Sequence, residues 1–170
     1  MKYIKIFQVD AFTDKLFAGN PAAVCILNKW LDESIMQSIG AENNLAETAF
    51  IVPVGDHYEI RWFTPQIEVD LCGHATLASA HVLFNYYGIE ADSIDFHSMN
   101  RGKLFVSRKG VELSLNFPTD DIRVVETPDI LKAAIGQEPM EAYKGKTDYA
   151  LVLKDQDAVE KCDPDFNLLR

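Results

Sequence analysis

Residues 74–88, HATLASAHVLFNYYG, constrain the fold more than any other segment of the sequence. They are good helix formers with few ionisable groups, and Gly88 is placed to end a helix. Apolar side chains point in nearly every direction around this predicted helix, whereas a helix on a protein surface has a single apolar stripe. We therefore expect a buried helix that a sheet wraps on most of its sides.

The segments on both sides of this helix predict the strands of that sheet. Residues 3–12 alternate polar and apolar side chains, which is typical of a strand with one buried face. Asp32 is placed to cap a helix over residues 33–42. Further strands are predicted at 22–27, 48–54, 58–65, 93–99, 102–108 and 111–117. The pattern indicates an α+β unit over residues 1–118.

The remaining segment, residues 119–170, starts a second unit that has no comparable core. Thr127 and Pro128 can cap and begin a short helix that ends near residue 136. A strand near residues 148–154 and a helical tail at 164–170 complete the prediction for this part of the chain.

The composition argues against several classes of partner. The formal net charge is −10, whereas nucleic acids and anionic membrane surfaces both favour clustered Lys and Arg. No apolar stretch approaches the roughly 18 residues that indicate a membrane span, and residues 1–12 resemble a strand rather than a signal peptide. Cys25, Cys72 and Cys162 are widely spaced and form no disulfide framework, so we expect a reducing, cytoplasmic location.

Glu47 is the first residue that could carry chemistry. It lies between an asparagine pair and an apolar strand, against Leu45 and Ala46. A carboxyl group in apolar surroundings loses solvation, which disfavours its charged form and lets it both take up and return a proton near neutral pH. The alternative is a solvated glutamate at a strand end, and the residue pattern leaves both readings open.

The start of the buried helix gathers a second set of candidate residues. Gly73 lets the backbone approach a ligand, and the first-turn N–H groups of His74, Ala75 and Thr76 can bind a substrate carboxylate or an enolate-like oxygen. A helix N-terminus would also lower the pKa of Cys72 and favour its thiolate. His74 could donate a hydrogen bond or shuttle a proton. The structural alternatives are a small buried hydrophobe for Cys72 and a capping or core residue for His74.

A metal site is a further interpretation of these residues. His74 and His81 are seven residues apart and could share one helix face, with Cys72 nearby. The helix supplies no further carboxylate, however, and the spacing matches neither a zinc ribbon nor a zincin. We therefore predict that no metal binds.

Four stretches occur in order along the chain: VDAFTDKLFAGNPAAVCIL, NNLAETAFI, RWFTPQIEVDLCGHATLASAHVL and LSLNFP. Together they resemble the PhzF family, the phenazine-biosynthesis-like isomerases and epimerases. The resemblance continues through DYALVLKDQDAVEKCDPDF to the end of the chain. It implies the diaminopimelate-epimerase-like fold, in which two α+β units each wrap a curved sheet around a central helix, with the active site between them.

The resemblance also implies a cofactor-independent isomerisation of a small-molecule substrate. The glutamate of the NLAET motif, which moves a proton between carbons, falls on Glu47. The GHAT motif lines the substrate site and falls on Gly73 and His74, and the GNP motif adds Asn20. Cys72 stands where related epimerases and racemases use a cysteine as one of two opposed bases, so it is a candidate acid/base.

Members of the family usually continue further and include a glycine-rich DPxTGSA-like motif, which has no match here. Since the sequence ends at Arg170, we expect a truncated second unit that forms a homodimer or pairs with a missing C-terminal half. Two other functions stay open: a non-catalytic module for small carboxylates or dimerisation, and a racemase that depends on Cys72.

Overall fold

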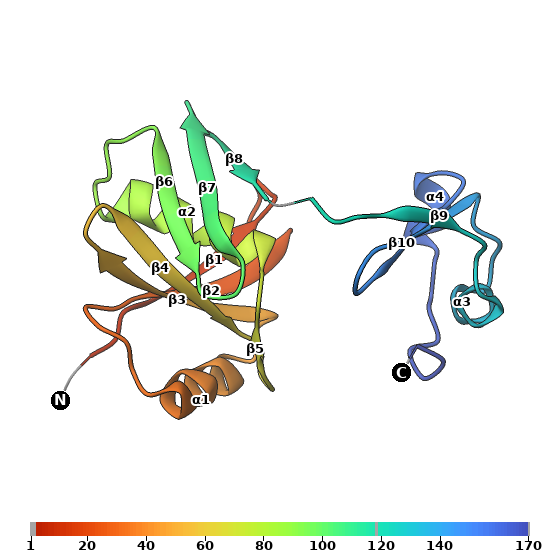
Figure 1. Cartoon of the computed structure of the whole chain (residues 1–170), viewed down its shortest axis with the longest axis horizontal. Helices are drawn as coiled ribbons and strands as arrows, with labels where there is room; N and C mark the ends of the chain where they lie inside the picture. Colours follow the sequence, from red (N-terminus) through yellow and green to blue (C-terminus); the bar gives the residue numbers. More distant parts are fainter. Residues whose placement is uncertain (1–2, 118, 170) are drawn as a thin grey trace. The chain divides into compact units, whose positions relative to one another are not determined.

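The computed structural model describes residues 3–117 and 119–169. Its contacts divide the chain into two compact units on either side of residue 118, and each unit has its own sheet (Figure 1). Residue 118, at which the first unit is predicted to end, lies outside the described residues.

The first unit is built on an eight-stranded mixed sheet. Its strands are β1 (Ile6–Ala11), β2 (Asn20–Ile26), β3 (Glu47–Val54), β4 (His57–Phe63), β5 (Glu68–Val69), β6 (Ser93–Ser98), β7 (Gly102–Lys109) and β8 (Glu112–Asn116). They follow the order β1-β2-β3-β4-β6-β7-β8, and β5 pairs with β4. The β2–β3 and β4–β6 pairs are parallel and the others are antiparallel. The predicted strands are confirmed, and the short β5 is an addition.

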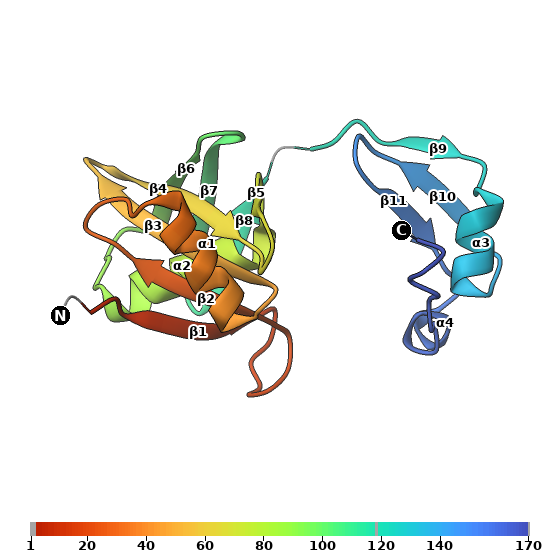
Figure 2. The same cartoon turned by 90° about the horizontal axis from the view of Figure 1, so that it is seen from below.

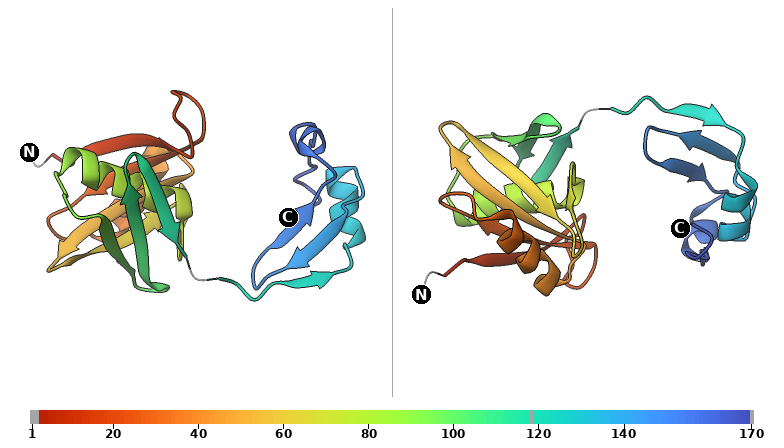
Figure 3. Two further views of the ribbon diagram at one scale, coloured as in Figure 1. Left: turned by 90° about the horizontal axis from the view of Figure 1, so that it is seen from above. Right: turned by 60° about the horizontal axis from the view of Figure 1, so that its bottom comes forward.

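The helix α2 (Gly73–Tyr86) lies inside the curve of this sheet, as Figures 1 and 3 show. It contacts β1, β2, β3, β7 and β8. Val82, Leu83 and Phe84 are all buried, and burial of each such side chain stabilises the fold by about 1.5–3 kcal/mol. The expectation of a helix wrapped on most sides is therefore confirmed, and the exposed His81 marks the side that the sheet leaves open.

The helix α1 (Glu33–Asn43) covers the opposite face of the sheet (Figures 1 and 2). Successive strand residues point to opposite faces, so Ala49 of β3 packs in the cluster around α2, whereas Phe50 packs with Met36 of α1. This two-sided burial explains why β3 is apolar at consecutive positions. Asp32 occupies the N-cap position as predicted, although its side chain makes no capping hydrogen bond.

The second unit contains a three-stranded antiparallel sheet and two short helices. Its elements are β9 (Arg123–Val125), α3 (Asp129–Ile135), β10 (Glu141–Lys144), β11 (Tyr149–Val152) and α4 (Gln156–Glu160), and the sheet order is β11-β10-β9. Ala134, Pro139 and Ala142 are the buried apolar residues found over 119–169. These small side chains bury little surface, so this unit has a small core.

Two details of the second unit differ from the sequence-based expectation. The N-cap of α3 is Pro128 rather than Thr127, because the Pro128 carbonyl accepts the first hydrogen bonds of the helix. The predicted helical tail at 164–170 is wrong: the helix lies earlier, at α4, and residues 166–169 form turns, while residue 170 lies outside the description. Asp155 caps α4 by accepting a hydrogen bond from the Ala158 N–H. Over the described part of the chain, no helix is long and apolar enough to cross a membrane.

Gly19 shapes the loop that leads into β2. Its φ angle is +75°, and a Cβ atom built there would lie 2.2 Å from the carbonyl oxygen of Ala11. The backbone of Ala11 pairs with Asn20 across β1 and β2 and has little freedom to retreat. The position therefore needs glycine both for its conformation and for its close contact.

We expect Gly19→Ala to lower the free energy of unfolding of the first unit by more than about 2 kcal/mol, since the left-handed conformation alone costs roughly 1–2 kcal/mol for an L-residue. Urea unfolding followed by tryptophan fluorescence measures this unit, because Trp30 and Trp62 both belong to it. Gly110→Ala is the matched control: its φ is +63° but no atom lies within 4 Å of an added Cβ. Equal losses in the two variants would contradict the role of the Ala11 contact.

Candidate active site

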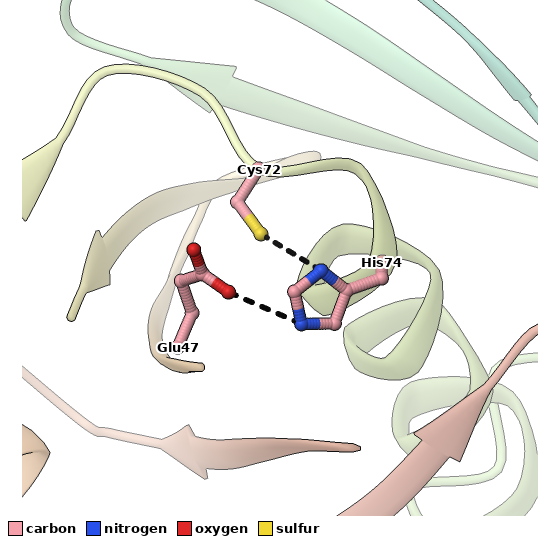
Figure 4. Close-up of side chains that lie close together, drawn as sticks. All are labelled: Glu47, Cys72 and His74. Carbon is pink, nitrogen blue, oxygen red and sulfur yellow. Dashed lines mark hydrogen bonds and ion pairs between the residues drawn. The ribbon is translucent and has the colours of Figure 1, made fainter. Parts of the chain in front are cut away.

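Three ionisable side chains meet at one end of the first unit (Figure 4). Glu47 is the first residue of β3, Cys72 precedes α2, and His74 is the second residue of that helix. The Nε2 atom of His74 lies 3.2 Å from Oε2 of Glu47, and its Nδ1 atom lies 3.4 Å from Sγ of Cys72. The carboxyl group and the thiol thus lie on the same side of the imidazole ring, each facing one of its nitrogen atoms (Figure 4).

The cluster is largely shielded from solvent. The His74 side chain is 9% exposed and that of Glu47 is 20% exposed. The Nε2–Oε2 separation is short enough for an ion pair, yet neither atom makes an aligned hydrogen bond within the described residues. Buried polar atoms are almost always paired. We therefore expect these two atoms to bind a ligand atom that approaches from the side of Glu47.

Cys72 departs from the sequence-based expectation. Burial raises the pKa of its thiol to about 12, and the negative charge of Glu47 adds to the effect. The backbone N–H groups of Ala75 and His74 act in the opposite direction, as expected for a helix N-terminus, but burial outweighs them. The prediction that this helix start favours the thiolate of Cys72 is therefore wrong.

The protonated thiol determines how the ring of His74 carries its own proton. The S–H group is a donor, and when it donates to Nδ1 that nitrogen carries no proton. In this tautomer the ring proton resides on Nε2, on the side of Glu47. This tautomer is assigned from the hydrogen-bond pattern, and it gives Glu47 a neighbouring donor.

The first turn of α2 offers fewer free donors than predicted. The Thr76 N–H donates to the Cys72 carbonyl oxygen at 3.3 Å, and the Thr76 hydroxyl donates to the same oxygen at 2.6 Å. The expectation of a free N–H group at Thr76 is therefore wrong. The N–H groups of His74 and Ala75 interact with the Cys72 side chain. Because the Ala75 side chain is fully buried, only its backbone could contact a ligand.

Gly73 has a structural role beside the predicted one. A Cβ atom at this position would lie 3.3 Å from Cε2 of Phe117 and 3.9 Å from Cδ2 of Leu115. The absent side chain thus makes room for the aromatic ring that follows β8. The predicted contact of Gly73 with substrate stays a prediction.

Asn20 lies at the same end of the sheet as the cluster. It is the first residue of β2, and its neighbour two positions on, Ala22, pairs with Glu47 in the parallel register. Asn20 itself pairs with Ala11 and is half-buried. This register is compatible with the predicted substrate contact but does not test it.

The cluster has a donor set that sequence reasoning did not assemble. One ligand atom each from Glu47, Cys72 and His74 lie within 4.8 Å of one another. His81, the histidine considered as a partner for His74, is exposed and interacts with Asn85 instead. The carboxylate that the helix lacks comes from Glu47 of β3. The parallel pairing of β3 with β2 brings this residue beside the helix start.

A groove of about 770 Å³ lies elsewhere on the first unit, between the β1–β2 loop, α2 and β8. Asp10, His81 and Glu112 contribute to its lining, and none of the three cluster residues does. Its ionisable groups are partly or fully exposed. We place the candidate active site at the cluster, because there the ionisable groups touch one another and are withdrawn from water.

The comparisons with known proteins agree with this fold. A family model described as phenazine biosynthesis-like protein matches residues 9–170. An uncharacterized isomerase of Pseudomonas aeruginosa is 46% identical over 167 residues, covering 98% of this chain and 64% of the relative. A phenazine biosynthesis-like domain-containing protein of Bos taurus is 44% identical over 144 residues, covering 78% of this chain and 50% of the relative.

Solved structures give the same result. The crystal structure of a PhzF family phenazine biosynthesis protein from Enterococcus faecalis superimposes with a TM-score of 0.90 at 48% identity, covering 98% of this chain and 63% of that one. A predicted epimerase of Pseudomonas aeruginosa superimposes with a TM-score of 0.70 at 20% identity and 95% coverage of this chain, against 63% of its own. This second likeness shows the fold alone.

The curved mixed sheet around a central helix is therefore the α+β, diaminopimelate-epimerase-like fold that the sequence predicts. The chain belongs to the PhzF family of phenazine biosynthesis-like proteins. It spans less than two thirds of the length of these relatives, 64% of the Pseudomonas aeruginosa isomerase and 63% of the Enterococcus faecalis protein.

The state of Cys72 can be tested by alkylation with iodoacetamide. Burial raises the pKa of this thiol to about 12, so it is almost wholly protonated at pH 8, and labelling mapped by mass spectrometry should be far slower than for free cysteine. Glu47→Gln removes a charge that raises this pKa, so it should accelerate labelling. The exposed Glu112→Gln should not. Rapid labelling of the wild type would refute the protonated thiol.

Proposed function

We propose that the chain carries the proton-transfer site of an isomerase or epimerase that acts on a small carboxylate-bearing or cyclic substrate without a cofactor. The observation that carries the proposal is the 3.2 Å contact between the Glu47 carboxyl group and the His74 ring at the start of α2. Membership of the PhzF family and the isomerase name of a relative at 46% identity support it.

Glu47 is the proposed proton carrier. Its carboxylate removes a proton from a weakly acidic C–H, and the electron pair of that bond moves into the adjacent conjugated or carboxylate-bearing system. The same carboxyl group then returns the proton to a carbon of the resulting anion, so that no net change in charge occurs. The 20% exposure of its side chain leaves Glu47 accessible, while the surrounding burial strengthens its electrostatic interactions.

His74 is the proposed partner of Glu47. Its Nε2–H can donate to the carboxylate or to a substrate oxygen that gains negative charge during the reaction. Cys72 supports this state of the ring through its contact with Nδ1 at 3.4 Å. We propose that substrate binding also involves Asn20 and the backbone at Gly73 and Ala75, which lie at the same end of the first unit.

A racemase that uses Cys72 as a base is the rival mechanism. A base must be deprotonated before it can accept a proton, and a thiol with a pKa of about 12 is almost wholly protonated near neutral pH. The Glu47 mechanism is therefore the better supported of the two.

Deuterium wash-in from solvent into candidate substrates with an acidic C–H tests the proposal, with NMR or mass spectrometry as the measurement. Glu47→Gln should slow exchange by about 10²–10⁴-fold, the usual contribution of a general base. Glu112→Gln removes an exposed charge on β8 and should leave exchange unchanged. Equal exchange in wild type and Glu47→Gln would remove Glu47 from the mechanism.

The second unit favours a further proposal, that this chain associates with another copy of itself. Few of its apolar side chains are buried, and many are exposed: Ile122, Val124, Ile130, Met140, Tyr149, Val152, Val159, Phe166, Leu168 and Leu169. Where exposed apolar side chains are contiguous, they usually mark an interface. A homodimer would cover it, and a partner chain equivalent to a C-terminal half is the alternative.

Sedimentation equilibrium distinguishes these outcomes. We expect a dimer at micromolar concentration, and Val124→Lys in β9 should weaken it by at least about tenfold, since burying a charge at an apolar interface costs more than 1.4 kcal/mol. Val111→Lys lies in the turn between β7 and β8 of the first unit and is the control. A strictly monomeric wild type would contradict the homodimer.

A further inference from the structure

We propose that the cluster of Glu47, Cys72 and His74 is also a binding site for a thiophilic divalent cation such as Zn²⁺, and that the bound ion blocks proton transfer by Glu47. The proposal concerns this same site and goes beyond its catalytic role. Metal binding itself can be measured without substrate, so its failure is distinguishable from failure of the proposed reaction.

The donor set matches the chemistry of zinc. A thiolate, an imidazole nitrogen and a carboxylate oxygen are its three common protein ligands, and sites with three protein ligands leave a fourth position open for water. Mg²⁺ and Ca²⁺ prefer oxygen ligands alone, so a cysteine and a histidine select against them. The donor set therefore favours Zn²⁺ and similar thiophilic cations over Mg²⁺ and Ca²⁺.

The distances fit with a small rearrangement. At usual zinc–ligand lengths, donors at neighbouring tetrahedral corners are about 3.3–3.6 Å apart, and the observed contacts are 3.2 Å for Nε2–Oε2 and 3.4 Å for Sγ–Nδ1. These contacts involve different ring nitrogens, whereas one ion binds one nitrogen. Since all three donors lie within 4.8 Å, a side-chain movement of roughly 1 Å gathers them around one ion.

A second observation points to a ligand at this place. His74 is more than nine-tenths buried, and its Nε2 atom has no hydrogen-bond partner within the described residues although it is directed at Glu47. The facing Oε2 atom of Glu47 also lacks one. An ion between them would satisfy both atoms at once, which removes the cost of leaving buried polar groups unpaired.

Binding changes the protonation of the site in a defined way. The S–H bond of Cys72 breaks, its proton leaves to solvent, and a sulfur–metal bond forms. The ring proton of His74 moves from Nε2 to Nδ1, which no longer accepts from the thiol, so that the lone pair of Nε2 can bind the ion. The carboxylate of Glu47 then donates to the ion rather than accepting a substrate proton. Occupancy by the ion and proton transfer by Glu47 are therefore mutually exclusive.

Titration of the whole chain with Co²⁺ as a spectroscopic substitute for Zn²⁺ tests the site. The wild type should bind one equivalent and develop a thiolate-to-cobalt charge-transfer band together with the strong visible absorption of four-coordinate cobalt, both of which Zn²⁺ then displaces. Cys72→Ser should lose the charge-transfer band. Cys25→Ser and Cys162→Ser are matched controls, because the first thiol is buried against α1 and the second lies in the other unit. Both variants should keep the charge-transfer band.

Two further variants keep the test independent of any single substitution. Glu47→Gln should weaken Co²⁺ binding at least about tenfold but retain the charge-transfer band, because the thiolate stays. His81→Ala removes the exposed histidine of α2 and should change nothing. Tryptophan fluorescence of each variant verifies that the first unit is folded.

A band that persists in Cys72→Ser, or a wild type that shows none at one equivalent, overturns the site. In the wild type, one equivalent of Zn²⁺ should reduce deuterium exchange at least about tenfold, whereas Mg²⁺ should not. Full exchange in the presence of bound Zn²⁺ would overturn the exclusion of proton transfer even if the site exists.

Discussion

The burial of α2 inside a curved sheet is the interaction on which the rest of the first unit depends. Its apolar residues need cover on several sides, and a sheet supplies this cover by curling from β1 through to β8. Once the helix axis is surrounded in this way, its N-terminus must emerge at one end of the strands. That end is where β3 begins, so the helix start and Glu47 meet as a consequence of core packing.

Burial also decides the electrostatics of the meeting point. The dipole and N–H groups of a helix start favour a thiolate, but the same packing that creates the helix start withdraws Cys72 from water. Desolvation is the larger effect, so the residue that looks most reactive in the sequence is a neutral hydrogen-bond donor in the fold. The protonated thiol acts on His74, two residues further along the chain, through the tautomer of its ring and the donor that faces Glu47. Glu47, whose side chain is 20% exposed, is then the accessible member of the set.

Local patterns anticipate most of the first unit. Alternation of polar and apolar residues indicates β1, and consecutive apolar residues indicate β3. The turn residues between β3 and β4 predict that these two strands pair. Local patterns fail to predict an element or a hydrogen bond that depends on residues in another part of the chain. The short β5 exists because β6 pairs with the start of β4 and leaves its last residues, Trp62 and Phe63, for β5. The predicted helical tail is misplaced because Asp155 caps an earlier helix. Thr76 likewise satisfies the carbonyl of Cys72 with both its N–H and its hydroxyl, which no spacing rule indicates.

The sequence alone determined the fold class, the apolar helix at its centre and the separate interest of Glu47, Cys72 and His74, since these follow from periodicity, propensity and motif. Only the tertiary structure decided that the three side chains form one cluster, with the carboxyl group and the thiol each facing one nitrogen of the imidazole ring. The physical reason is distance along the chain. Glu47 and His74 belong to elements that β4 and β5 separate, and a through-space contact of 3.2 Å arises only when the sheet closes around the helix.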